Sequence, residues 1–131
     1  PKRRVTQGAH SMKPWQAQVN NFVGQGGEAA AKRHLLDQGY EILETNWSCK
    51  IGEIDIIARK NRMIIFVEVK TSRTIHAARQ MIGQAQQRRI ANAAKLWIRE
   101  NAFKPTYLFR FDAILVGAEQ KLQHIEGAWT T

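Results

Sequence analysis

The sequence is poor in cysteine, and it has no long apolar run. Cys49 is the only cysteine among the 131 residues, which excludes an intrachain disulfide and is typical of a reducing compartment. No apolar run approaches the roughly 20 residues that a membrane-spanning helix needs, and the first ten residues, PKRRVTQGAH, lack the apolar stretch of a signal peptide. We therefore expect a cytoplasmic protein without a membrane partner.

Acidic residues are scarce relative to basic ones. Asp and Glu number 11 against 20 Lys and Arg, so the formal net charge is +9. A charge of this sign favours polyanionic partners such as DNA. Residues 1–12 are predicted to be a basic N-terminal arm or a cloning remnant, and they hold only three of the basic residues. Residues 13–131 show no repeat or linker, so they are predicted to form one domain.

Hydrophobic spacing predicts the order helix, three strands, helix, strand and a short C-terminal strand. A helix is expected from about Gly27 to Gly39, and a second, long helix from about Ala77 to Asn101. Short stretches rich in β-branched and aromatic residues predict the strands, with the first three forming an antiparallel meander. These strands cover 40–47, 52–59, 63–70, 108–116 and 122–127. The predicted fold class is α/β (α+β), a mixed sheet flanked by helices.

Two charged residues interrupt the apolar run MIIFVEVK. Glu68 and Lys70 alternate with valines and therefore point to the same face of the predicted strand. Asp55 lies in the preceding strand, GEIDIIAR. Pairing through a turn centred on residue 61 predicts that Asp55 faces Val67, so strand twist or a bulge would have to bring the two carboxylates together.

Two carboxylates beside a lysine, on a basic protein, suit one kind of chemistry. Carboxylate oxygens bind Mg²⁺ or Mn²⁺, together with waters and phosphate oxygens of a substrate. A lysine close by could stabilise charge on an attacking water or on the phosphate. The pattern predicts phosphodiester hydrolysis.

The two motifs GEIDIIAR and FVEVKT, with 13 positions from acid to acid, resemble the PD-(D/E)XK nuclease superfamily. The chain is more closely similar to the bacterial YraN-type family of endonuclease-like proteins. That similarity extends from GGEAAAKRHLLDQGYEIL through both motifs to RFD and the ending HIEGAW. The resemblance implies a restriction-endonuclease-like αβββαβ core, in agreement with the order predicted from hydrophobic spacing.

The resemblance also implies a metal-dependent DNA endonuclease, whose substrates would include branched or otherwise non-standard DNA. Asp55 and Glu68 match the metal-binding acids, with the Val69 carbonyl as an extra ligand, and Lys70 matches the motif lysine. Glu28 matches an acid of the first helix that points into the same site in related nucleases. The cofactor would be Mg²⁺ or Mn²⁺, and dimerisation would suit a branched substrate.

Two positions depart from the pattern of the resembled families. Ile54 stands where the superfamily's name has proline, and Gln86 stands where a lysine is expected. Gln86 is predicted to face the sheet, and its amide could still hydrogen-bond a phosphate or a water. With Arg88 and Arg89 it forms the predicted nucleic-acid-binding set.

Each of these interpretations has a structural alternative. Glu68 and Lys70 could form an ion pair on an edge strand, Glu28 could be a helix-surface acid, and the arginines could line a solvated face. The whole protein could be a non-catalytic nucleic-acid-binding or adaptor protein. Asp112 is expected to be a structural hydrogen-bond acceptor, and Trp47 a core residue. The histidines show no zinc spacing, and no Gly-rich loop indicates a nucleotide cofactor.

Overall fold

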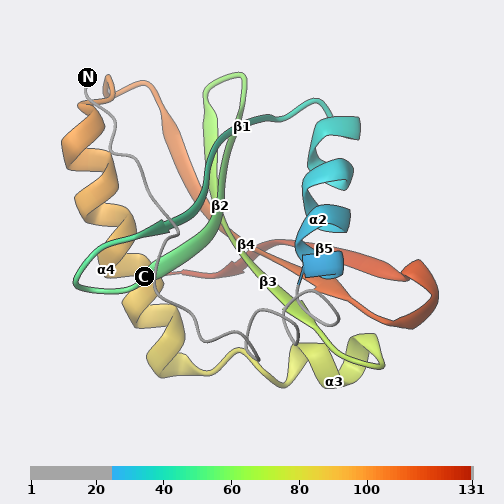
Figure 1. Ribbon diagram of the computed structural model, residues 1–131. Coiled ribbons are helices and arrows are strands. Elements are labelled where there is room, and N and C mark those ends of the chain that lie inside the picture. The colour runs from blue at the N-terminus through green and yellow to red at the C-terminus, as the bar shows by residue number, and fades with distance from the viewer. Residues whose placement is uncertain (1–24, 131) are drawn as a thin grey trace.

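Five strands form one mixed sheet in a computed structural model of the protein, which describes residues 25–130 (Figure 1). The predicted arm at residues 1–12 lies outside the described residues. The strands are adjacent in chain order, with the first three antiparallel, β4 parallel to β3, and β5 antiparallel to β4. Their bounds are β1 Glu41–Ser48, β2 Glu53–Lys60, β3 Met63–Thr71, β4 Leu108–Val116 and β5 Leu122–Trp129. The predicted strands and the mixed sheet are confirmed.

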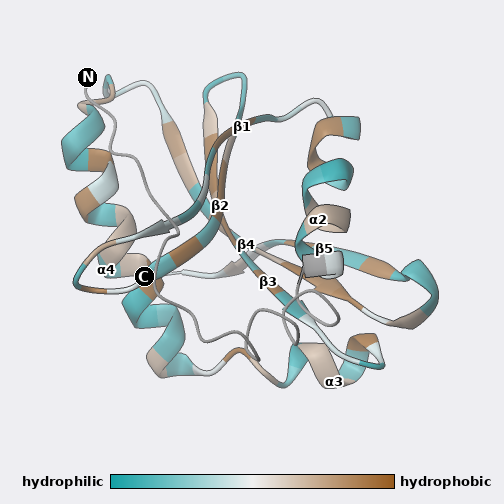
Figure 2. Cartoon of the chain, viewed as in Figure 1, coloured by the Kyte–Doolittle hydropathy of each residue, from teal (hydrophilic) through white to brown (hydrophobic). Residues whose placement is uncertain are grey.

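Two helices, α2 (Gln25–Asp37) and α4 (Gln84–Asn101), lie on opposite sides of the sheet (Figure 1). Each covers its own hydrophobic cluster. On the α4 side, Trp97 packs with Trp47 and Phe66, and on the α2 side, Leu35 packs with Ile56 and Val67. Along α4 hydrophilic and hydrophobic stretches alternate, as expected of a helix with one buried face (Figure 2). A short 3-10 helix, η2 (Ala118–Gln120), precedes β5.

The predicted single helix from Ala77 to Asn101 is wrong. The segment forms a short helix, α3 (Ile75–Arg79), and then α4, which begins only at Gln84. Thr74 caps α3, since its Oγ1 accepts a hydrogen bond from Ala77 N at 3.0 Å. Gly83 has extended backbone angles before α4, and glycine is a poor residue for continuing a helix because of its conformational entropy.

The register between β2 and β3 also differs from the prediction by one residue. Ile56, not Asp55, is paired with Val67, and Lys60 is paired with Met63. The turn therefore has two residues, and the first of them, Asn61, adopts a positive φ of 57°. The same register carried one residue further places Asp55 opposite Glu68, so no bulge is needed to bring the acids together.

Candidate active site

Two carboxyl groups meet where the pairing of β2 and β3 ends. The last paired residues are Ile56 and Val67. Beyond them the Asp55 side chain takes the place of a strand partner, because its Oδ2 accepts a hydrogen bond from Val69 N at 2.8 Å. The Glu68 side chain beside it is only 5% exposed. Asp55 and Glu68 thus form a carboxyl pair in which Glu68 is almost fully buried and Asp55 is partly buried.

The environment of this pair opposes the ionisation of both groups. Burial raises the pKa of Asp55 well above its ordinary value, and the charge of Glu68 raises it further, although the Val69 N–H opposes the change. Burial also raises the pKa of Glu68, against the stabilising contacts of Lys70 and of the Asp55 carboxyl. Two buried carboxylates side by side are costly unless a proton or a cation lies between them.

Two donors hold one oxygen of Glu68. Lys70 Nζ lies 3.1 Å from Glu68 Oε2, and Gln86 Nε2 donates to the same oxygen at 2.8 Å. Gln86 comes from α4, so the prediction that it faces the sheet is confirmed. The interpretation of Glu68 and Lys70 as an edge-strand ion pair is wrong in its placement, because β3 lies between β2 and β4 in the middle of the sheet.

Glu28 approaches the pair from the first turn of α2. Its side chain is half-buried, which raises its pKa against the opposing effects of Lys32 and Asn46. The charge of Glu28 also raises the pKa of Asp55. Within residues 25–130, the buried Glu28 Oε2 has no hydrogen-bond partner. The structure therefore brings together Glu28, Asp55, Glu68 and Lys70, which the sequence singled out.

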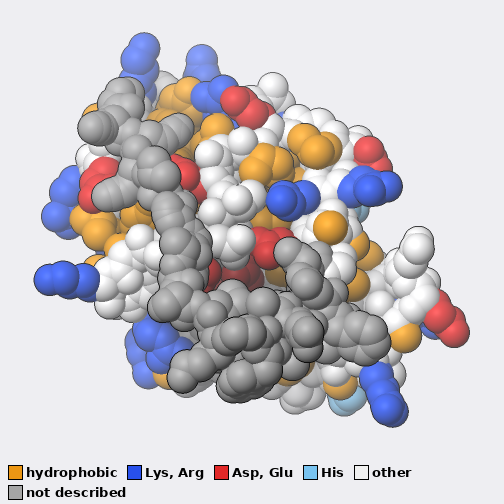
Figure 3. All heavy atoms as spheres, in the orientation of Figure 1, with side chains coloured by type: hydrophobic (Ala, Val, Ile, Leu, Met, Phe, Trp, Pro, Cys, Tyr) orange, Lys and Arg blue, Asp and Glu red, His pale blue; other side chains and the backbone are white. Residues whose placement is uncertain are grey.

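A view of one face of the molecule shows several acidic side chains near its middle, with Lys and Arg mostly around the outside (Figure 3). Arg88 and Arg89 of α4 are exposed and do not share the contact of Gln86 with Glu68. Among the residues that the structure describes, no group of three or more His, Cys, Asp or Glu side chains is arranged to hold a metal ion. The same part of the chain has no helix that is long and apolar enough to cross a membrane.

Replacing one acid of the pair is expected to stabilise the metal-free protein. Asp55→Asn keeps an acceptor for Val69 N and removes a like charge beside Glu68, so we expect a gain of about 1 kcal/mol at neutral pH. Because the pKa of Asp55 is raised on folding, the carboxylate costs stability at high pH, and the gain should vanish as the pH falls below 3.8, its ordinary pKa. Urea unfolding in EDTA from pH 3 to 8 measures it.

Glu100→Gln is the control for that measurement, because Glu100 is an exposed carboxylate of α4. It should change stability by no more than about 0.5 kcal/mol, the range usual for an exposed position. A loss of stability in Asp55→Asn at pH 7 would show that the carboxyl pair does not strain the folded protein.

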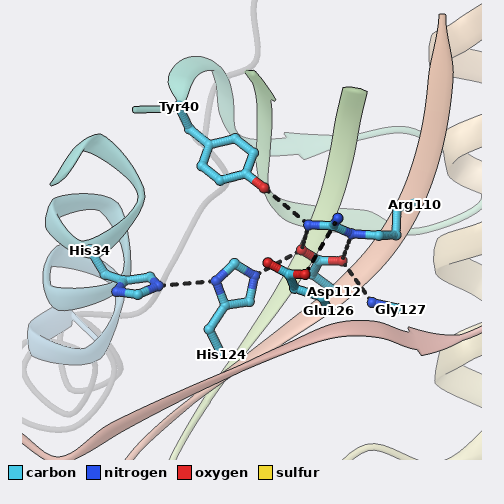
Figure 4. Close-up of polar contacts among 7 residues, drawn as sticks. All are labelled: His34, Tyr40, Arg110, Asp112, His124, Glu126 and Gly127. Atoms are coloured by element: carbon cyan, nitrogen blue, oxygen red, sulfur yellow. Dashed lines mark hydrogen bonds and ion pairs between the residues drawn. The ribbon is translucent and has the colours of Figure 1, made fainter. Parts of the chain in front are cut away.

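A second polar cluster surrounds Asp112, which has no exposed surface (Figure 4). Its Oδ1 accepts hydrogen bonds from Arg110 Nε at 2.7 Å and Gly127 N at 3.1 Å. Its Oδ2 accepts from Arg110 Nη2 and from His124 Nε2, both at 2.8 Å. Burial alone would raise the pKa of Asp112, but these donors together hold it below its ordinary value. Asp112 is a structural acceptor, as expected from the sequence.

The cluster continues from Asp112 to α2. His124 Nδ1 lies 3.0 Å from Nε2 of His34, a residue of α2. Because the Asp112 carboxylate can only accept, His124 donates to it from Nε2. Burial lowers the pKa of His34, and the nearby His124 lowers it further, against the effect of Asp37.

The sheet order, the flanking helices and the acid–acid–lysine arrangement define a restriction-endonuclease-like fold. The model of the Uncharacterised protein family UPF0102 matches residues 27–116. The UPF0102 protein of Nitrobacter winogradskyi is 38% identical over 107 residues, which cover 82% of this chain and 91% of that protein. That of Syntrophotalea carbinolica is 40% identical over 112 residues, 82% of this chain and 90% of that protein. The chain belongs to the UPF0102 family, the YraN-type family that its motifs resemble.

Proposed function

We propose that the protein is a metal-dependent endonuclease that hydrolyses phosphodiester bonds of DNA, including branched or otherwise non-standard DNA. The observation that carries this proposal is the carboxyl pair of Asp55 and Glu68 with Lys70 in contact with Glu68. A merely structural ion pair would need one carboxylate for one lysine. Here Asp55 is a second, partly buried acid, and among residues 25–130 no cation is paired with it.

The donor set suits a hard divalent cation. Asp55 and Glu68, with the main-chain carbonyl of Val69, would hold Mg²⁺ or Mn²⁺, ions that prefer oxygen ligands and retain several waters. Burial raises the pKa of both carboxyls, and the charge of Glu68 raises that of Asp55 further, so a positive charge between them would favour their ionised forms. The unpaired Oε2 of Glu28 is available to accept a hydrogen bond from a metal-bound water. The bound ion would polarise the scissile phosphate and lower the pKa of a water.

Lys70 and Gln86 would orient the Glu68 carboxylate, and Lys70 would also stabilise developing negative charge. Lys70 and Gln86 hold the Glu68 carboxylate in one orientation through its Oε2. The Lys70 ammonium also places a positive charge where negative charge develops on the attacking water or the phosphate. The amide of Gln86 is neutral, so it positions Glu68 without adding the positive charge that a lysine would bring.

Incubation of the protein with labelled linear, flapped and four-way DNA in Mg²⁺ or Mn²⁺ tests the proposal. We expect cleavage of at least one DNA by the parent protein, and a loss of at least about 100-fold in rate for Glu68→Ala and Lys70→Ala. Glu100→Gln is the matched control, because Glu100 is an exposed acid near the C-terminal end of α4, whereas Gln86 contacts Glu68 from the N-terminal end of that helix. It should retain cleavage.

The variants must share the fold of the parent, which circular dichroism and thermal unfolding establish. Cleavage that persists unchanged in Glu68→Ala would place the chemistry elsewhere or in a contaminant. Binding of DNA without cleavage in either metal, unaffected by both alanine substitutions, would favour the non-catalytic adaptor.

A further inference from the structure

A groove of about 420 Å³ lies between α4 and the end of β5. One wall consists of α4 side chains, and Trp129 and Thr130 form the other side. Trp129 is only 9% exposed and stacks on Phe111, with ring centroids 5.6 Å apart, so this side of the groove is rigid. The groove is separate from the contacts of the carboxyl pair.

The lining of the groove is basic and rich in amides. Among the described residues that line it, Arg88 and Lys95 are the charged ones, and none is an acid. These two residues are seven positions apart on one helix, so they lie on the same face and about 10 Å apart along the axis. The amide side chains are those of Gln84, Gln87 and Asn92. Cations spaced along a helix, with amides beside them, match the phosphates and base edges of a nucleic-acid strand.

The groove and the carboxyl pair lie on different sides of the first turn of α4. Gln84 lines the groove, while Gln86, two residues later, donates to Glu68. The two sites are therefore separated by little more than one helix diameter, about 10–12 Å. The first turn of α4 carries no acidic residue, and Gly83 supplies no side-chain cap.

We propose that this groove binds a single-stranded segment of the nucleic acid whose phosphodiester bond lies at the carboxyl pair, an inference that rests on the proposed function. The shape of the groove selects a single strand over a duplex. A helix that reads a duplex must project into the major groove, whereas Trp129 flanks α4 and makes this surface concave. Arg88 and Lys95 contact phosphates, and the amides contact base edges.

Fluorescence anisotropy in EDTA tests the groove without cleavage. The probes are a labelled DNA 16-mer, the RNA of the same sequence and the DNA duplex, each titrated at several salt concentrations. On a single strand each phosphate contact contributes about 0.7 to the slope of log K against log[salt]. Arg88→Gln with Lys95→Gln should therefore lower the slope by about 1.4 and weaken binding.

Lys121→Gln is the control, because Lys121 is exposed and lies in the turn between β4 and β5, far from α4 (Figure 1). It should leave the slope unchanged. If the double variant loses affinity equally for DNA and RNA, the groove recognises the phosphates that both share. If it loses affinity for only one of them, that is the strand that the groove accepts.

Several results would overturn the inference. No binding of any probe by the parent at low salt, an unchanged slope in the double variant, or a loss confined to the duplex would each exclude a single-strand groove. A failure of this inference can be distinguished from a failure of the proposed function. If the parent protein cleaves DNA and the groove variants bind normally, only the groove proposal is wrong. If binding depends on the groove but no metal-dependent cleavage occurs, only the nuclease proposal is wrong.

Discussion

Asp112→Ala is expected to lower the free energy of unfolding by about 3–5 kcal/mol, the range typical of breaking a buried ion pair by removing one partner. Asp112 is fully buried and accepts four hydrogen bonds, from Arg110, His124 and Gly127. Alanine would leave the Arg110 guanidinium, which is only 22% exposed, with the exposed carboxylate of Glu126, 3.7 Å away, in place of a buried one. Urea unfolding at pH 7 measures the loss.

The pH dependence of this loss follows from the lowered pKa of Asp112. A carboxyl group whose pKa falls on folding stabilises the protein above its unfolded pKa, and that contribution is lost as the pH falls through its folded pKa. The difference between parent and variant should therefore be constant from pH 5 to 8 and shrink below pH 3.8, the ordinary value.

Glu41→Gln provides the comparison. Glu41 pairs with Arg59 at 2.7 Å, but its side chain is 60% exposed, so water screens the pair and the substitution should change stability little. If Asp112→Ala proved no more destabilising than Glu41→Gln, the cluster around Asp112 would not hold α2 and β5 to the sheet.

That cluster could not be predicted from the sequence. Its members are far apart in the chain, with 90 positions between His34 and His124, and no local spacing marks them as partners. Asp112 alone could be interpreted, because its alternation with apolar neighbours placed it on a core strand. The donors to Asp112 depend on the order of the strands and on the side of the sheet that α2 covers.

The carboxyl pair, by contrast, was accessible from the sequence because it depends on local chemistry. Alternation placed Glu68 and Lys70 on one face, and the hairpin placed Asp55 close by. The error of one residue in the register arose from counting Lys60 in the turn, whereas the positive φ of Asn61 permits a two-residue turn. The break before α4 is hidden in the sequence because the apolar period continues from Ile82 to Ile90, whereas α3 ends at Arg79 and Gly83, with extended backbone angles, is the N-cap of α4.

The position of Glu28 depends on a close approach that only glycine permits. An added Cβ at Gly27 would overlap Thr71 Oγ1 and lie 3.2 Å from Thr71 Cβ, so the first turn of α2 would have to move away from β3. We expect Gly27→Ala to lower the free energy of unfolding by about 2–3 kcal/mol, the upper part of the range for overpacking. Thermal or urea unfolding measures it.

The neighbouring glycine provides a matched control. An added Cβ at Gly26 would meet nothing within 4 Å, so Gly26→Ala should be neutral or slightly stabilising, as alanine is a better helix former. Thr71→Ala in the Gly27→Ala protein should recover at least about 1 kcal/mol, because it removes the overlapping hydroxyl. Equal effects of the two glycine substitutions, or no recovery in the double variant, would show that α2 does not depend on this contact. In that case its first turn could shift, and with it Glu28, without loss of the fold.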